Sequence, residues 1–178
     1  MKEIKYAFLG NPRFAEIILE KLIKSGFPPE IVICNPDKPV GRKKVVTPPE
    51  TKVIAEKYDI KIYQPEKLTL ENWQENIGEV DVCVLAAYGK IIPDKIIQSI
   101  DKGIIGVHPS LLPKFRGPTP IQSVILEGEN KTGITLYLMD EEVDHGPVIA
   151  KRELSAVMNK INYEDLEEKL AELSADLI

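Results

Sequence analysis

The chain has 178 residues, of which 43% are hydrophobic and 29% are charged. This length and balance are typical of one globular domain and exclude a wholly disordered or fibrous chain. The 23 basic and 28 acidic residues give a net charge of -5, which argues against a bulk electrostatic grip on nucleic acid and leaves only a local basic patch to consider.

The composition also limits cofactors and location. Cys34 and Cys83 lie in apolar runs and are expected to be buried thiols, because the sequence has neither a disulfide framework nor a CxxC motif. We expect no metal site, since two histidines and two separated cysteines do not make a ligand set. No segment approaches the roughly 20 apolar residues that span a bilayer, and the N-terminus lacks a signal-peptide pattern. We therefore expect a cytoplasmic protein with no membrane contact.

Strand and helix patterns alternate along the chain. In order, the first half predicts a strand at 4–9, a helix from 14 to about 25, a strand at 30–34, a loop at 35–49, a helix at 50–58, a strand at 60–63, a helix at 69–77 and a strand at 80–87. The second half predicts a helix at 94–100, a strand at 103–107, a loop at 108–119, a helix at 120–127, strands at 132–139 and 147–154, and an amphipathic helix from 163 onward.

This alternation predicts an α/β fold, a Rossmann-like doubly wound and mostly parallel sheet with helices on both faces. The last two predicted strands are joined by a short connection, so we expect an antiparallel pair at one end of the sheet. In such sheets ligands bind beyond the carboxyl ends of the strands. The rule directs attention to the loops that begin at residues 10, 35, 87, 108 and 140.

Three of these loops carry residues that could take part in binding or catalysis. The turn GNPRFAE has one glycine and a proline, so a dinucleotide fingerprint is excluded and an ordinary strand-to-helix turn is favoured. The basic loop 35–49 indicates either a solvated charged loop, which composition alone favours, or a phosphate-binding patch. His108 follows a predicted strand and Asp144 follows another. The pair is either a proton-transfer site or a capping residue and a turn residue, and spacing leaves both open.

The residues also carry a family resemblance over nearly the whole chain. HPSLLPKFRGPTPIQ and TGITLYLMDEEVDHGPVIA resemble the formyltransferases that use 10-formyltetrahydrofolate. FLGNPRFAEIILEKLI, NPDKPVGRKKVVTPPETKVIAEKY, QPEKL and LAAYGKIIP resemble the methionyl-tRNA family within that superfamily. The resemblance implies formyl transfer from 10-formyltetrahydrofolate to the amino group of methionine on initiator tRNA.

The resemblance further implies a role for each matching residue. His108 would assist proton transfer and oppose charge on the oxygen, and Asp144 would orient it, as catalytic residues. The implied folate contacts are Ser110, Leu111, Leu112, Pro113, Ala87, Tyr88, Gly89, Lys90, Ile91, Ile92 and Val143. The implied contacts to the acceptor end of tRNA are Arg42, Lys43 and Lys44.

Two departures from the family pattern matter. Gly106 stands where the family has an asparagine, whose amide would donate to the formyl oxygen. Glycine is expected to leave room for a water there, and we expect Gly106→Asn to raise the formylation rate. The sequence also stops where the tRNA enzymes continue into a basic C-terminal domain, so 1–178 is expected to be the catalytic domain alone, as a monomer. An amino-sugar nucleotide as acceptor, or a catalytically dead folate-binding homologue, are the alternatives.

Overall fold

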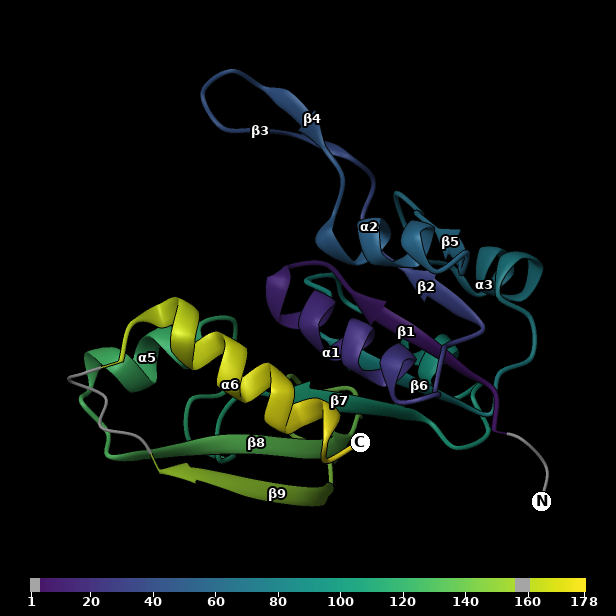
Figure 1. The fold of residues 1–178 in the computed structure, drawn as a ribbon. Helices are drawn as coiled ribbons and strands as arrows, with labels where there is room; N and C mark the ends of the chain where they lie inside the picture. Colours follow the sequence, from purple (N-terminus) through teal and green to yellow (C-terminus); the bar gives the residue numbers. More distant parts are fainter. Residues whose placement is uncertain (1–3, 156–160) are drawn as a thin grey trace.

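The computed structural model describes residues 4–155 and 161–178. Its elements follow in the order β1 (Tyr6–Gly10), α1 (Arg13–Lys24), β2 (Ile31–Ile33), β3 (Lys38–Val40), β4 (Val45–Thr47), α2 (Glu50–Lys57), β5 (Lys61–Tyr63), α3 (Leu70–Asn76), β6 (Val82–Ala86), α4 (Asp94–Ile97), β7 (Ile104–His108), α5 (Pro120–Leu126), β8 (Lys131–Leu138), β9 (Val148–Ser155) and α6 (Tyr163–Ala175). Figure 1 shows these elements along the chain.

Seven of these strands form one twisted sheet in the order β5-β2-β1-β6-β7-β8-β9. The first five run parallel, and β8 and β9 are antiparallel additions at one end. The predicted mostly parallel sheet with an antiparallel pair at its end is therefore confirmed. Strand order reverses at β1, where β2 lies on one side and β6 on the other, so ligands are expected beyond the carboxyl ends of these strands.

The alternation of side chains along β1 builds a core on each face of the sheet. Phe8 points to the face covered by α1, α2, α5 and α6, where Leu166 and Leu170 of α6 are fully buried. Ala7 and Leu9 point to the opposite face, which α3 and α4 cover with Trp73 and Ile96, among others. Successive residues of a strand face opposite sides, so one short apolar run serves both cores.

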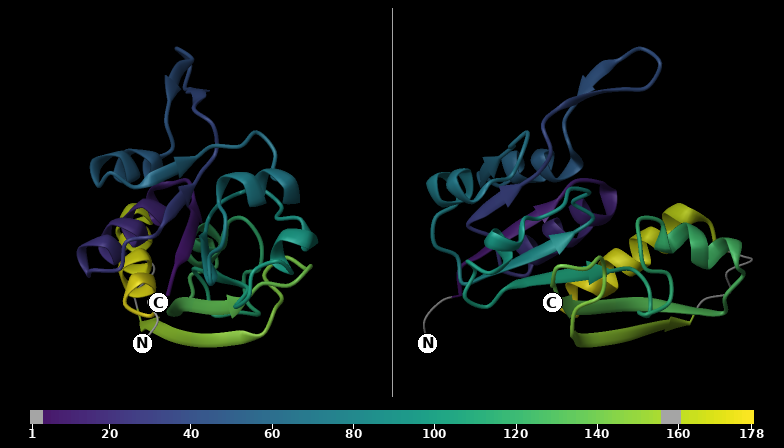
Figure 2. Two further views of the ribbon diagram at one scale, coloured as in Figure 1. Left: turned by 90° about the vertical axis from the view of Figure 1, so that its right-hand side faces the viewer. Right: turned by 180° about the vertical axis from the view of Figure 1, so that it is seen from behind.

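The predicted loop 35–49 contains a feature that the sequence did not indicate. Residues Lys38–Val40 and Val45–Thr47 pair as a two-stranded antiparallel hairpin, separate from the main sheet. All six residues are exposed. Figures 1 and 2 show the hairpin extending away from the body of the domain. A strand pattern of alternating polar and apolar residues is absent because neither face of this hairpin is buried.

Candidate active site

A cavity of about 580 Å³ lies at the carboxyl edge of the sheet. The loops after β1, β6, β7 and β8 line it, together with the start of α5 and the first turns of α6. It therefore lies where the strand-order rule places ligands. Its walls are mostly apolar, and its polar lining includes His108, Asp144 and Tyr137, which contact one another through the Asp144 carboxylate.

The structure brings His108 and Asp144 together, which the spacing in the sequence left open. His108 is the last residue of β7 and is only 5% exposed. Its Nδ1 lies 3.5 Å from the Oδ2 of Asp144, and its Nε2 lies 2.8 Å from the carbonyl oxygen of Phe115. Each ring nitrogen thus faces an acceptor, and a neutral imidazole can donate to only one of them.

Asp144 is held in place by two further donors. The backbone N–H of Gly117 donates to its Oδ2 at 2.8 Å, and the hydroxyl of Tyr137 donates to its Oδ1 at 2.8 Å. Its backbone has a φ of 50°, in the left-handed region that Asp and Asn adopt more readily than other non-glycine residues. The carboxylate is therefore fixed from two directions, and its Oδ2 is presented to His108.

Gly106 is placed differently from what the sequence led us to expect. It lies in β7, two residues before His108, and is paired directly with Tyr137 of β8. A Cβ built on Gly106 would lie 2.4 Å from two carbons of the Tyr137 ring. The ring therefore fills the space that was expected to admit a water. An asparagine side chain at position 106 would meet the Tyr137 ring, so the ring would have to move in Gly106→Asn, and the effect of this substitution on the rate stays a prediction.

The segment after β6 lines the cavity as the sequence led us to expect. All six residues from 87 to 92 belong to the lining, and so does Val143, whose side chain is exposed. The Asn11 amide donates to the carbonyl of Tyr88, which ties this segment to the turn after β1. Lys90 donates to the carbonyls of Pro65 and Glu66 at 2.8 and 3.0 Å, and burial lowers its pKa.

The SLLP segment, expected to contact folate, lies outside the lining of this cavity. Ser110 is fully buried and its hydroxyl donates to the carbonyl of Lys114 at 2.6 Å. The backbone N–H of Leu112 donates to Thr135 Oγ1 at 3.1 Å, the side chain of Leu111 packs near Gly133, and Pro113 is exposed. These contacts hold the loop that carries Phe115 and Gly117. The segment therefore helps to position the two backbone groups that contact His108 and Asp144.

The basic residues expected to contact tRNA lie apart from the cavity lining. Arg42, Lys43 and Lys44 occupy the turn of the β3–β4 hairpin and are exposed. The hairpin follows the carboxyl end of β2, and His108 ends the parallel strand β7, so both lie at the same edge of the sheet. The basic turn therefore lies outside the cavity lining but on the same side of the domain as the cavity.

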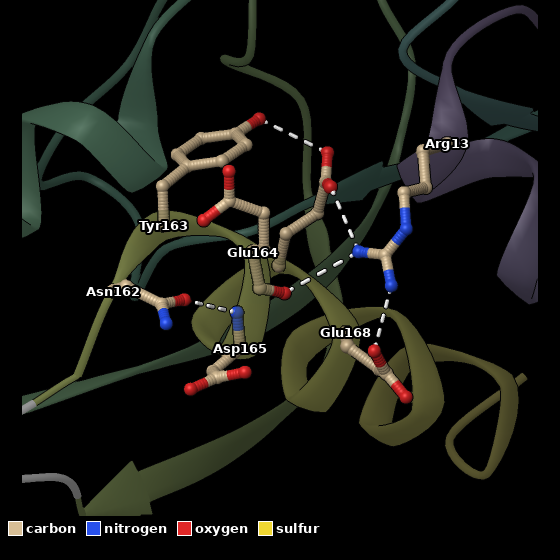
Figure 3. Close-up of polar contacts among 7 residues, drawn as sticks. Arg13, Asn162, Tyr163, Glu164, Asp165 and Glu168 are labelled. Carbon is tan, nitrogen blue, oxygen red and sulfur yellow. Dashed lines mark hydrogen bonds and ion pairs between the residues drawn. The ribbon is translucent and has the colours of Figure 1, made fainter.

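The last helix supplies cavity residues that the sequence analysis missed. Tyr163 and Glu167 of α6 belong to the lining, and Glu167 is only 5% exposed. Tyr163 donates to Glu167 Oε1 at 3.0 Å, and Arg13 donates to Glu167 Oε2 at 3.2 Å. Figure 3 shows Arg13 of α1 reaching across to the first turns of α6, where it also meets Glu168 at 2.6 Å. The sequence gives no sign that Glu167 is buried, because acidic residues on amphipathic helices usually face solvent.

Among residues 4–155 and 161–178, no three His, Cys, Asp or Glu side chains gather where they could hold a metal ion. No helix within those ranges is long and apolar enough to cross a membrane.

The fold and the cavity define an α/β domain with a ligand site beyond the carboxyl ends of its parallel strands, and sequence similarity assigns the family. Residues 4–178 match the formyl transferase family, so the chain belongs to it. The chain is 42% identical over 176 residues to the methionyl-tRNA formyltransferase of Thermotoga sp. (strain RQ2), and 41% identical over 176 residues to that of Staphylococcus aureus (strain Newman). Each match covers 98% of this chain and 56% of the relative, so the chain spans little more than half the length of these relatives.

Solved structures agree with this assignment. A phosphoribosylglycinamide formyltransferase from Anaplasma phagocytophilum superposes with a TM-score of 0.76 at 25% identity, covering 98% of this chain and 83% of that chain. A formyltetrahydrofolate deformylase from Pseudomonas syringae superposes with a TM-score of 0.73 at 21% identity, covering 98% of this chain and 59% of that chain. The second likeness establishes the fold alone.

Proposed function

We propose that this chain is the catalytic domain of an enzyme that transfers a formyl group from 10-formyltetrahydrofolate to the amino group of methionine on initiator tRNA. The relatives of 41–42% identity, which are named methionyl-tRNA formyltransferases, support the acceptor. The single observation that carries the chemistry is the contact between His108 and Asp144 at the edge of a mostly apolar cavity.

The cavity suits a folate. Its volume of about 580 Å³ lies within the usual range for small-molecule sites, roughly 300–1,000 Å³. The wall formed by residues 87–92, together with Val143, combines apolar side chains with backbone groups, as a flat heteroaromatic ring with donors and acceptors requires. Residues 87–92 would hold the ring, and the formyl group would lie toward His108.

The residues of this chain would act through position and charge. The bound folate supplies the formyl carbon: the acceptor nitrogen bonds to that carbon, the carbon's bond to the folate nitrogen breaks, and the proton lost by the amine ends on that folate nitrogen. His108 would relay this proton and oppose the charge on the formyl oxygen through Nε2, which has to exchange its contact with the Phe115 carbonyl for one with the substrate. Asp144 holds the imidazole in the orientation for that task, as its contact with Nδ1 provides.

The basic hairpin turn would serve the acceptor. Arg42, Lys43 and Lys44 are exposed at the tip of a projecting element, where phosphates can reach them. Phosphate contacts from Arg and Lys give affinity that falls with salt and carry no base specificity. We expect Arg42→Ala to raise the KM for tRNA, with the salt dependence reduced, and to leave folate binding unchanged. Arg152→Ala, an exposed arginine on β9, is the matched control.

The test is a formylation assay with 10-formyltetrahydrofolate and charged initiator tRNA, with glycinamide ribonucleotide and an amino-sugar nucleotide offered in parallel. Formylation of the tRNA alone supports the proposal. His108→Ala should abolish transfer while circular dichroism shows a folded domain, and His145→Ala, which lies outside the cavity lining, should remain active. Preference for either small acceptor would overturn the tRNA assignment. Folate binding without any transfer would identify a binding module instead.

A further inference from the structure

Tyr137 is a buried tyrosine of the site to which neither the sequence motifs nor the family match gives a role. It lies in β8 directly opposite Gly106 of β7, it is 4% exposed, and it lines the cavity. A Cβ at position 106 would lie 2.4 Å from its ring and 2.7 Å from its hydroxyl. The tyrosine ring can occupy this position only because residue 106 has no side chain.

The hydroxyl of Tyr137 has one partner that matters for the site. It donates to Asp144 Oδ1 at 2.8 Å, while Oδ2 of the same carboxylate faces His108 Nδ1 at 3.5 Å. A phenol has a single proton, so in this geometry it is used on Asp144. Burial and the neighbouring Asp144 raise the pKa of Tyr137 far above its usual value, so the donor persists at alkaline pH.

We propose that Tyr137 is a positioning residue for the transfer reaction: it fixes Asp144, and through Asp144 it orients His108, and Gly106 is the residue that admits it. The inference rests on the proposed function for its kinetic consequence and on the structure alone for its geometry. It also supplies a reason for glycine at position 106 other than loss of activity.

The alternative is that the ring merely packs over the glycine, as aromatic residues do across antiparallel strands. Tyr137→Phe separates the two, because it keeps the ring against Gly106 and removes only the hydroxyl. A packing role predicts an unchanged enzyme. A positioning role predicts a kcat lower by about 10- to 100-fold, as expected for a lost hydrogen bond to a charged group, with the KM for folate within about twofold.

A double-mutant cycle tests whether the hydroxyl acts through Asp144. Asp144→Asn is the second variant, because asparagine tolerates the left-handed backbone at this position. If Tyr137 acts through the carboxylate, Tyr137→Phe should lower kcat in the native background and change it little in the Asp144→Asn background. Effects that multiply in the double variant would overturn the proposal.

A second measurement does not depend on catalysis. The chain has only two histidines, so imidazole nitrogen spectra contain two sets of signals, which His145→Gln assigns. His145 contacts Asp140 at 2.8 Å and provides an internal control. Tyr137→Phe should shift the signals of His108 and leave those of His145 in place. Unshifted His108 signals would refute the positioning role even in an active enzyme. Shifted signals in a chain that formylates no acceptor would refute the proposed function and leave the geometry standing.

Discussion

Adding one carbon atom at position 106 should strongly destabilise the domain. In Gly106→Ala the new Cβ would lie 2.4 Å from the Tyr137 ring, so the ring must move by about 1 Å to reach an ordinary contact of 3.4 Å. Overpacking of this kind costs about 1–3 kcal/mol. Displacing the ring also breaks the hydrogen bond of Tyr137 to the Asp144 carboxylate, worth about 1.5–3 kcal/mol. The free energy of unfolding should therefore fall by about 2.5–6 kcal/mol, and Gly106→Asn should fall at least as far.

Chemical denaturation of four proteins measures this effect: the native chain, Gly106→Ala, Tyr137→Ala and the double variant. Removing the ring leaves space for the new carbon, so Gly106→Ala should cost far less in the Tyr137→Ala background than in the native one. The reasoning is refuted if Gly106→Ala costs under about 1 kcal/mol in the native chain, or the same amount in both backgrounds.

Three further results are expected. Arg13→Ala should lower the free energy of unfolding by about 1–3 kcal/mol in denaturation, because it removes a donor from the buried carboxylate of Glu167; equal stability would count against this. Burial raises the pKa of Cys34 to about 11 and of Cys83 to about 12. Unfolded thiols ionise near 8.5, so as the pH rises from 8.5 to 10 the free energy of unfolding should fall with a slope that steepens toward about 1.4 kcal/mol per pH unit for each thiol. Cys83→Ala should halve that slope. Thr135→Val should lower the free energy of unfolding by about 1–3 kcal/mol for each backbone group left without its partner, the N–H of Leu112 and the carbonyl of Ser110 in the loop after β7. An unchanged melting curve would show that Thr135 does not hold this loop.

The sequence predicted the sheet because its apolar runs are long enough to be buried. Residues 82–87 are continuously apolar, and β6 (Val82–Ala86) is a central strand covered on both faces. The hairpin Lys38–Val40 and Val45–Thr47 escaped prediction because exposed valines beside prolines produce no periodicity. Each of these strands is defined by its pairing with the other, and the short stretch of sequence around one strand does not show that pairing.

The candidate site was predicted in part. His108 and the loop 87–92 were found because strand ends in such folds carry ligands. Tyr137 and Glu167 were not found, because nothing in the residues around either one marks it as a site residue. Their contacts are with residues far away in the sequence. The signal for Tyr137 was a glycine in the neighbouring strand, and it becomes readable only once the register of β7 and β8 is known.

The walls of the cavity draw on distant parts of the sequence, with Pro12 and Phe14 from around the start of α1 and Tyr163 and Glu167 from α6. Arg13 and Glu167, which join α1 to α6, are 154 positions apart. A molecule that fills the cavity therefore binds only a chain whose last helix has already docked. Binding therefore raises the free energy of unfolding of the whole domain, by about 2.7 kcal/mol at a ligand concentration 100 times Kd. With folate as the proposed ligand, its concentration would determine the free energy of unfolding of the domain as well as its rate.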